Sequence, residues 1–472
     1  MAEPKGGMED KLGGSRNIAI GMGAASLAAL ALLFLLLRPA DAQAIQQTGG
    51  GAHYVGVATC GGTTCHGRNN GDGPRVRQDE VMLWQNPATA AGAHSRAYGV
   101  LREARSRAIA QRLGLGEASG EPMCLGCHAT PGGARGVRFQ TGDGVGCESC
   151  HGAAGGWLSS HYAVGGTHQA NVRNGLVELD DPRVRARTCL NCHYGSREDG
   201  QFVNHRIMAA GHPRISFELD LFSTLQQHYL IDRDYYIDRR KKNPDGTQIW
   251  AIGQAMALQR SLDLFKRPSR GVEGIFPEFY FFDCHSCHRQ ISDDPRYRPG
   301  AAANPGRSIP AGMPPYNDEN MIMLSAAARV IAPGLAARFD RQSLAFHAAM
   351  ATGRVEALRE ARELDAILEL LIQAFSSATI TADTTFAIID RITTDAIRDR
   401  FTDYAGSVQA VMATDTLLSS LVSRERVSVA AANAIRVDIN SAYRAVRDPN
   451  AYDPGGFRAS LGRAAAAIRR LR

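Results

Sequence analysis

All ten cysteines of the 472-residue chain lie in five motifs, each a pair of cysteines followed directly by a histidine. C-x-x-C-H is the attachment signature of c-type haem, in which two thiols bond to the porphyrin and the histidine ligates the iron. Four motifs have this spacing, whereas the first is the rarer C-x4-C-H. The sequence therefore predicts five covalently bound haem c groups. The predicted thioether cysteines are Cys60, Cys65, Cys124, Cys127, Cys147, Cys150, Cys189, Cys192, Cys284 and Cys287. The predicted proximal iron ligands are His66, His128, His151, His193 and His288.

Other uses of paired cysteines explain these motifs less well. A structural zinc site needs two C-x-x-C knuckles for four ligands, so five knuckles leave one over. A disulfide framework is compatible with an exported chain and an even cysteine count, but it gives no reason for the histidines. A thioredoxin-like C-x-x-C motif would occur once in a domain rather than five times.

Nine of the fourteen histidines remain for the second axial position, which a low-spin electron-transfer haem fills with histidine or methionine. His94 is expected to open a helix that runs to Leu113. His205 and His212 are seven residues apart, so one helix face could present both to neighbouring haems. The candidate distal ligands are His94, His161, His205, His212, His168 and His285. The other three, His53, His228 and His347, are interpreted as surface or hydrogen-bonded side chains.

The amino terminus has the layout of a secretory signal. Lys5, Lys11 and Arg16 precede an uncharged, mostly apolar stretch at residues 18–37, and small-residue cleavage sites follow at residues 40–44. The apolar stretch is also long enough to span a bilayer. Residues 1–44 are therefore predicted to be a signal peptide or a membrane anchor. Both alternatives place the remaining chain outside the cytoplasm, in the periplasm of a bacterium, where haem is attached to such motifs.

Composition divides the remaining chain into two parts. Residues 45–290 hold all five motifs and are rich in glycine, which suits irregular backbone wrapped around cofactors. Residues 291–316 are rich in proline, aspartate, arginine and glycine and are predicted to be a linker. From residue 317 apolar side chains recur at helical intervals, which predicts an antiparallel bundle over residues 317–472. The helical stretches are expected at residues 321–331, 341–375, 384–401, 403–420, 427–446 and 456–471. The expected fold class is mainly α: an irregular haem-wrapping domain followed by a helical bundle.

The order of the motifs resembles the cytochrome c-554 family, tetrahaem cytochromes that carry electrons from hydroxylamine oxidoreductase in ammonia oxidisers. The resemblance covers about residues 55–215. It rests, in chain order, on the first motif, Trp84, Ala-His94-Ser-Arg-Ala-Tyr, Cys124-Leu-Gly-Cys-His128, Gly144-Val-Gly-Cys-Glu-Ser-Cys-His151-Gly, His161, and Cys189-Leu-Asn-Cys-His193 with a downstream histidine.

The resemblance implies a mostly helical, irregular fold with closely packed haem pairs. It implies that His94 and His161 ligate distant haems, and that His205 or His212 serves the first haem. It also implies an open, high-spin iron on His128. This chain departs from the family in the C-x4-C-H spacing, in the fifth motif at Cys284 and in the carboxy-terminal bundle. It is thus identified as a pentahaem variant.

The leading functional hypothesis is an electron carrier, because closely spaced redox centres with both axial positions filled need no substrate pocket. The expected partners are redox proteins or a quinol-oxidising membrane complex. The alternative is an oxidoreductase that acts on a small nitrogen or sulfur compound at an open haem. The formal net charge of +6 is mild for this length and no dense basic stripe is present, so no nucleic-acid partner is expected. Residues 317–472 could recruit a partner, form an oligomer or pack against the haem domain.

Overall fold

Helices account for nearly all regular structure in the computed structural model. It describes residues 52–72, 77–229, 245–271, 276–288, 293, 314–398 and 404–472. Within these ranges there is no β-strand, and the isolated bridges are Tyr54 with Arg135 and Phe282 with Tyr316. The expectation of a mainly α fold is confirmed. The predicted signal segment and most of the predicted linker lie outside the described residues.

Short helices joined by turns make up residues 52–229. The α-helices there are α2 (Val57–Cys60), α3 (Glu80–Gln85), α4 (Ala104–Leu113), α5 (Pro122–His128), α6 (Glu148–His151), α7 (Leu158–Tyr162), α8 (His168–Arg173), α9 (Pro182–His193), α10 (His205–Ala209) and α11 (Leu219–Leu225). The 3-10 helices are η1 (Ala90–Ala93), η2 (Gly99–Arg102), η3 (Ala118–Gly120), η4 (Thr141–Asp143) and η5 (Ala154–Gly156). The longest helix, α9, begins with Pro182 behind the capping side chain of Asp181, and the histidine of the fourth motif is its last residue.

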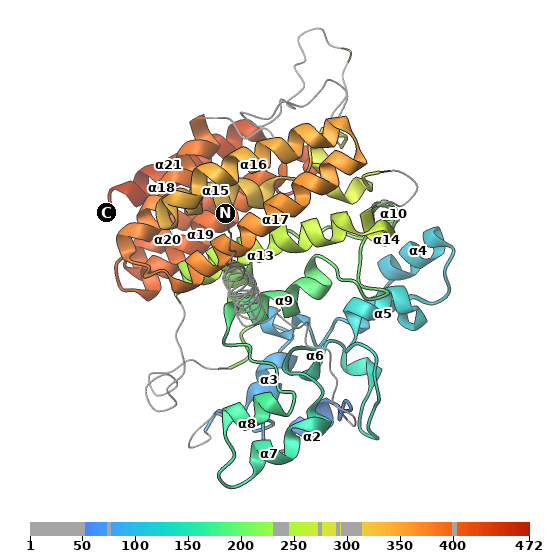
Figure 1. Cartoon of the computed structure of the whole chain (residues 1–472). Helices are drawn as coiled ribbons and strands as arrows, with labels where there is room; N and C mark the ends of the chain where they lie inside the picture. Colours follow the sequence, from blue (N-terminus) through green and yellow to red (C-terminus); the bar gives the residue numbers. More distant parts are fainter. Residues whose placement is uncertain are drawn as a thin grey trace, which may run out of the picture. The chain divides into compact units, whose positions relative to one another are not determined.

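Long helices make up most of the described chain after residue 245. The α-helices are α13 (Gly246–Lys266), α14 (Pro268–Gly271), α15 (Glu319–Ile331), α16 (Pro333–Thr352), α17 (Arg354–Ser377), α18 (Ala382–Arg398), α19 (Tyr404–Ser423), α20 (Val429–Ala445) and α21 (Pro454–Arg469). The 3-10 helices are η6 (Phe279–Phe281), η7 (Cys284–Ser286) and η8 (Pro449–Ala451). Figure 1 shows α15 to α21 in orange and red, with α13 beside them.

Two helical stretches are shorter than the sequence suggested. The stretch at residues 341–375 is two helices, because Gly353 adopts an extended conformation between α16 and α17. The helix expected from His94 to Leu113 is interrupted at Glu103, whose extended backbone separates η2 from α4. The expectation that one helix carries both His205 and His212 was also wrong, since α10 ends at Ala209.

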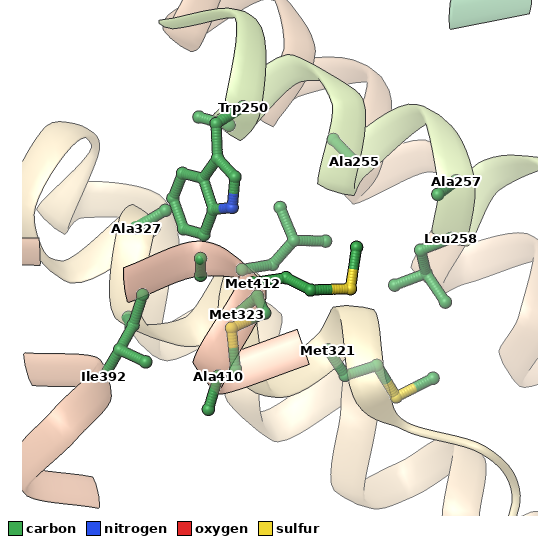
Figure 2. Close-up of a cluster of buried hydrophobic side chains, with 14 of the residues drawn as sticks. Trp250, Ala255, Ala257, Leu258, Met321, Met323, Ala327, Ile392, Ala410 and Met412 are labelled. Carbon is green, nitrogen blue, oxygen red and sulfur yellow. The ribbon is translucent and has the colours of Figure 1, made fainter. Parts of the chain in front are cut away.

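The main hydrophobic core lies among the long helices. Helix α13 packs against α15, α17 and α19 of the bundle and against α9 of the haem-motif region. Figure 2 shows Trp250 and Leu258 of α13 among Met323 of α15 and Met412 of α19, all buried. Flexible methionine side chains fill the irregular spaces between crossing helices. The same core reaches Leu190 of α9, so the bundle and the helix of the fourth motif share one interior.

Residues 52–229 bury few apolar side chains of their own. Apart from residues that join the main core, the described clusters there are Leu101 with Ala110 and Ala118, and Leu113 with Ile207 and Ala210. Such clusters are too small to hold a region of this length by apolar burial alone. Residues 52–229 therefore need a further source of buried apolar surface besides their own side chains.

None of the helices in the described ranges is both long enough and apolar enough to cross a membrane.

Candidate haem sites

Each of the five motif histidines faces one histidine from outside the motifs. The pairs, with the distances between ring centres, are His66 with His161 at 6.1 Å, His94 with His193 at 6.3 Å, His128 with His212 at 6.2 Å, His151 with His228 at 6.4 Å and His205 with His288 at 6.2 Å. Every motif histidine thus has one partner, and no partner is shared.

These spacings match two imidazoles on opposite sides of one metal ion. A first-row metal lies about 2.0–2.1 Å from an imidazole nitrogen, which itself lies about 1.2 Å from the ring centre, so two coaxial rings have centres about 6.4 Å apart. Direct stacking of two rings would bring their centres closer together. The donor set at each place is therefore suited to hold one iron between two neutral imidazoles.

Hydrogen bonds to the other ring nitrogen fix the direction of several of these rings. Nδ1 of His128 lies 2.8 Å from the carbonyl oxygen of Ala97, and Nδ1 of His212 lies 2.8 Å from that of Pro213. Nδ1 of His66 is 3.0 Å from Oε2 of Glu80. A ligating imidazole typically donates its second N–H to a carbonyl or carboxylate, which leaves Nε2 for the metal.

Burial lowers the pKa of five of these imidazoles, which favours their neutral form: His94, His161, His193, His212 and His228. Desolvation, with a smaller contribution from His94, lowers the pKa of His193 to about 4. The rings of Phe217 and Phe222 each lie 5.1 Å from that of His193 and supply its apolar surroundings. His66 differs, because its hydrogen bond with Glu80 raises its pKa. A neutral imidazole has the lone pair that iron requires.

The attachment cysteines are all free thiols, and some of them lie close to a cysteine of another motif. Cys60 of the first motif lies next to Cys147 of the third, and Cys127 of the second lies next to Cys192 of the fourth. In each pair the interaction raises the pKa of one thiol, that of Cys60 or Cys192. The porphyrin edges attached at these positions would therefore be neighbours.

Glu148, inside the third motif, fixes the segment that precedes the first motif. Its buried carboxylate accepts hydrogen bonds from the backbone N–H groups of Val55 at 2.9 Å, Gly56 at 2.8 Å and Ala154 at 2.7 Å. Gly56 adopts a positive φ of 87°, and a Cβ there would lie 2.5 Å from the carbonyl oxygen of Arg138. The segment that leads into α2 is thus fixed against the third motif.

The bundle holds the fifth motif. Asp283 precedes Cys284, and its carboxylate accepts a hydrogen bond from the backbone N–H of Ser286. The backbone N–H of Asp283 donates to the carbonyl oxygen of Pro315. Arg214 lies 3.6 Å from Sγ of Cys284 and forms a 3.1 Å ion pair with Glu319, the first residue of α15. Tyr194 follows the fourth motif, and its hydroxyl donates a hydrogen bond to Asn320, the second residue of α15. The first turn of α15 thus connects the fourth motif with the fifth.

The candidate distal histidines proposed from the sequence fall into two groups, according to whether they face a motif histidine. His94, His161, His205 and His212 each face a motif histidine, whereas His168 and His285 do not. His168 is exposed and gathers with Glu178 and Asp180 at the surface. His285 faces no motif histidine; its Nδ1 lies 3.1 Å from the carbonyl oxygen of Pro449 and its ring packs against Tyr452.

Three placements differ from the expectations drawn from the sequence, two of which came from the resemblance. His161 rather than His205 or His212 faces His66 of the first motif. His212 faces His128, the histidine whose iron the resemblance implied to be open. His228, which was interpreted as a surface or hydrogen-bonded residue, faces His151. No motif surrounds His228, so the sequence carried no local signal for this placement.

Residues 59–152 match the family model described as cytochrome c554 and c-prime. No curated protein and no solved structure matches the chain. The match covers the first three motifs and supports a c-type cytochrome of the multihaem electron-transfer kind, with haem c as its cofactor.

Proposed function

We propose that this protein is a pentahaem c-type cytochrome that passes electrons between redox partners outside the cytoplasm. The observation that carries the proposal is the set of five histidine pairs, each spaced for one iron. Bound haem c supplies one-electron chemistry at its iron, with a potential set by axial ligands, burial and neighbouring charge. The chain supplies ten thiols for attachment and ten imidazoles for ligation.

Contacts between motifs support transfer along a connected row. The cysteine contacts join the first motif to the third and the second to the fourth, while Cys150 of the third motif lies near Cys189 and Cys192 of the fourth. His212 and His205 extend this row from the second motif to the fifth. These two residues are no more than about 25 Å apart even in a fully extended chain.

The histidine pairs favour a carrier over an enzyme. An enzyme of this class needs an iron with one position open for substrate, and the resemblance placed that opening at His128. In the proposed assignment His212 fills the position, and each of the other motif histidines also has a partner. The export expected from residues 1–44 is part of the proposal, since haem c is attached outside the bacterial cytoplasm.

Mass spectrometry and paramagnetic resonance of the purified protein test the proposal together. We expect a mass equal to the polypeptide with five haems, and ferric spectra that contain five low-spin irons. Addition of cyanide or carbon monoxide should leave these spectra unchanged, because no position is open. Fewer than five haems would contradict the attachment sites, and a stoichiometric high-spin signal would favour the enzyme.

A further inference from the structure

Five exposed arginines on or next to α4 make no ion pair among the described residues. We call this surface the arginine face; its residues are Arg96, Arg102, Arg105, Arg107 and Arg112. All five are exposed, and their hydrogen bonds go to carbonyl oxygens or to the hydroxyl of Tyr98. Arginines elsewhere commonly pair with a carboxylate, as Arg424 does with Asp245 and Arg436 with Asp415.

The arginine face carries a local excess of positive charge. Glu103 is the single acidic residue between positions 96 and 112, so this segment has a net charge of +4. Unpaired charge of one sign creates a local potential that attracts ligands of the opposite sign.

The same segment contacts His128 directly and contacts the two residues that precede His212. The carbonyl of Ala97 binds Nδ1 of His128 at 2.8 Å. Arg105 donates a 2.7 Å hydrogen bond to the carbonyl of Gly211, and Arg112 a 2.8 Å bond to that of Ala210. These carbonyls immediately precede His212. The positive charge therefore lies beside the ligands of one particular site.

We propose that the arginine face is the docking surface for an acidic electron-transfer protein, which exchanges electrons with the haem held by His128 and His212. This inference rests on the proposed function and adds the chemistry of the partner and the position at which it binds. Complementary charge guides such a partner and orients it, and the effect weakens as salt increases. None of the exposed large apolar side chains among the described residues lies between positions 96 and 112, which favours a protein over a lipid surface.

The test uses the haem-loaded full chain and a reduced flavodoxin, chosen as a small, strongly acidic redox protein. The variant is Arg102→Glu with Arg107→Glu, because neither side chain holds the segment before His212. The control is Arg362→Glu with Arg391→Glu, two exposed arginines on α17 and α18 that make the same change of charge. Stopped-flow absorbance gives the rate of haem reduction, and biolayer interferometry gives the affinity for oxidised flavodoxin.

We expect the wild-type rate and affinity to fall as salt is raised. At low ionic strength the Arg102/Arg107 variant should be slower by about tenfold, with a comparable loss of affinity, and the control by no more than about twofold. A salt-independent wild-type rate, or equal effects of the two variants, would overturn the inference. So would loss of binding to anionic phosphatidylserine vesicles in the Arg102/Arg107 variant with flavodoxin kinetics unchanged, since that identifies a membrane surface.

Reduction by dithionite separates this inference from the proposed function. Dithionite is small and does not need a protein-sized surface, so it should reduce all five haems fully in every variant. If it does while flavodoxin shows no preference, the docking surface is wrong and the carrier stands. If the wild-type protein lacks five reducible haems, the proposed function itself fails.

Discussion

His228 lies opposite His151 of the third motif, with the two ring centres 6.4 Å apart and the ring planes at 81°. Its Nδ1 is 3.2 Å from the carbonyl oxygen of Gln226, an arrangement that leaves Nε2 for a metal. The two residues are 77 positions apart, so only the folded chain brings them together.

Replacing His228 should open one iron. In His228→Ala we expect one of the five ferric irons to become high-spin and to bind carbon monoxide after reduction, because the strong sixth ligand is lost. Magnetic circular dichroism counts the spin states. His168→Ala and His285→Ala are the matched controls and should keep five low-spin irons. A low-spin His228→Ala protein, with a high-spin iron in either control, would reverse the assignment.

The angles between paired rings should divide the haems into two spectroscopic classes. The planes meet at 67°, 84° and 81° in the pairs of His193, His128 and His151, but at 20° and 37° in those of His66 and His288. Perpendicular imidazoles donate to different iron d orbitals and leave these nearly degenerate, which increases the anisotropy of the g tensor. We expect three strongly anisotropic and two rhombic low-spin signals. Five rhombic signals would contradict the observed ring orientations.

Removing the thiols of the fifth motif should remove one haem. Cys284→Ser with Cys287→Ser is expected to reduce the mass by one haem and leave the other four attached, because each motif supplies its own thiols. The bundle core is formed mainly by α13 and α15 to α21, so its helical circular dichroism should persist. Loss of more than one haem would indicate that attachment at the fifth motif supports the others.

Glu148→Ala should destabilise the region of the first and third motifs. The substitution leaves three backbone N–H groups without the buried carboxylate that binds them, which should lower the free energy of unfolding by about 3–5 kcal/mol. Denaturant unfolding followed by haem absorbance measures the change. Glu178→Ala, at an exposed position, is the control and should change stability by less than about 0.5 kcal/mol. Equal values for the two variants would refute the role of Glu148.

Glu319→Gln should raise the reduction potential of the fifth haem. Glu319 neutralises Arg214, whose guanidinium lies 3.6 Å from Sγ of Cys284, and loss of the negative charge favours the reduced iron. The expected shift is about 50–100 mV for a unit charge roughly 10 Å from the iron at an effective dielectric constant near 20. Spectroelectrochemical titration measures it, with Glu363→Gln, at an exposed position of α17, as the control. An unchanged or lower potential would contradict this prediction.

Local sequence predicted the attachment chemistry, because thiols and proximal histidine are contiguous in each motif. It predicted the helical bundle from apolar periodicity, although Gly353 divides one expected helix into two. The partners of the irons were harder to predict, since each depends on segments that meet only in the folded chain. His205 and His212 were expected on one helix, but α10 ends at Ala209, before His212. His285 is held by Pro449, a contact no local pattern signals. The burial of α13 in the bundle was not anticipated either.

The scarcity of apolar burial in residues 52–229 has a consequence for how the protein matures. The long helices bury their own apolar side chains, whereas in the proposed assignment the first half gains much of its interior only when porphyrins are attached. In the proposed assignment, the distal ligand of the third iron, His228, lies far along the chain from His151. The distal ligand of the fifth iron, His205, precedes its partner His288. We therefore expect this region to begin as a flexible, solvent-exposed chain and to become rigid as haems are attached. Each attachment should restrict the conformations available to the next motif.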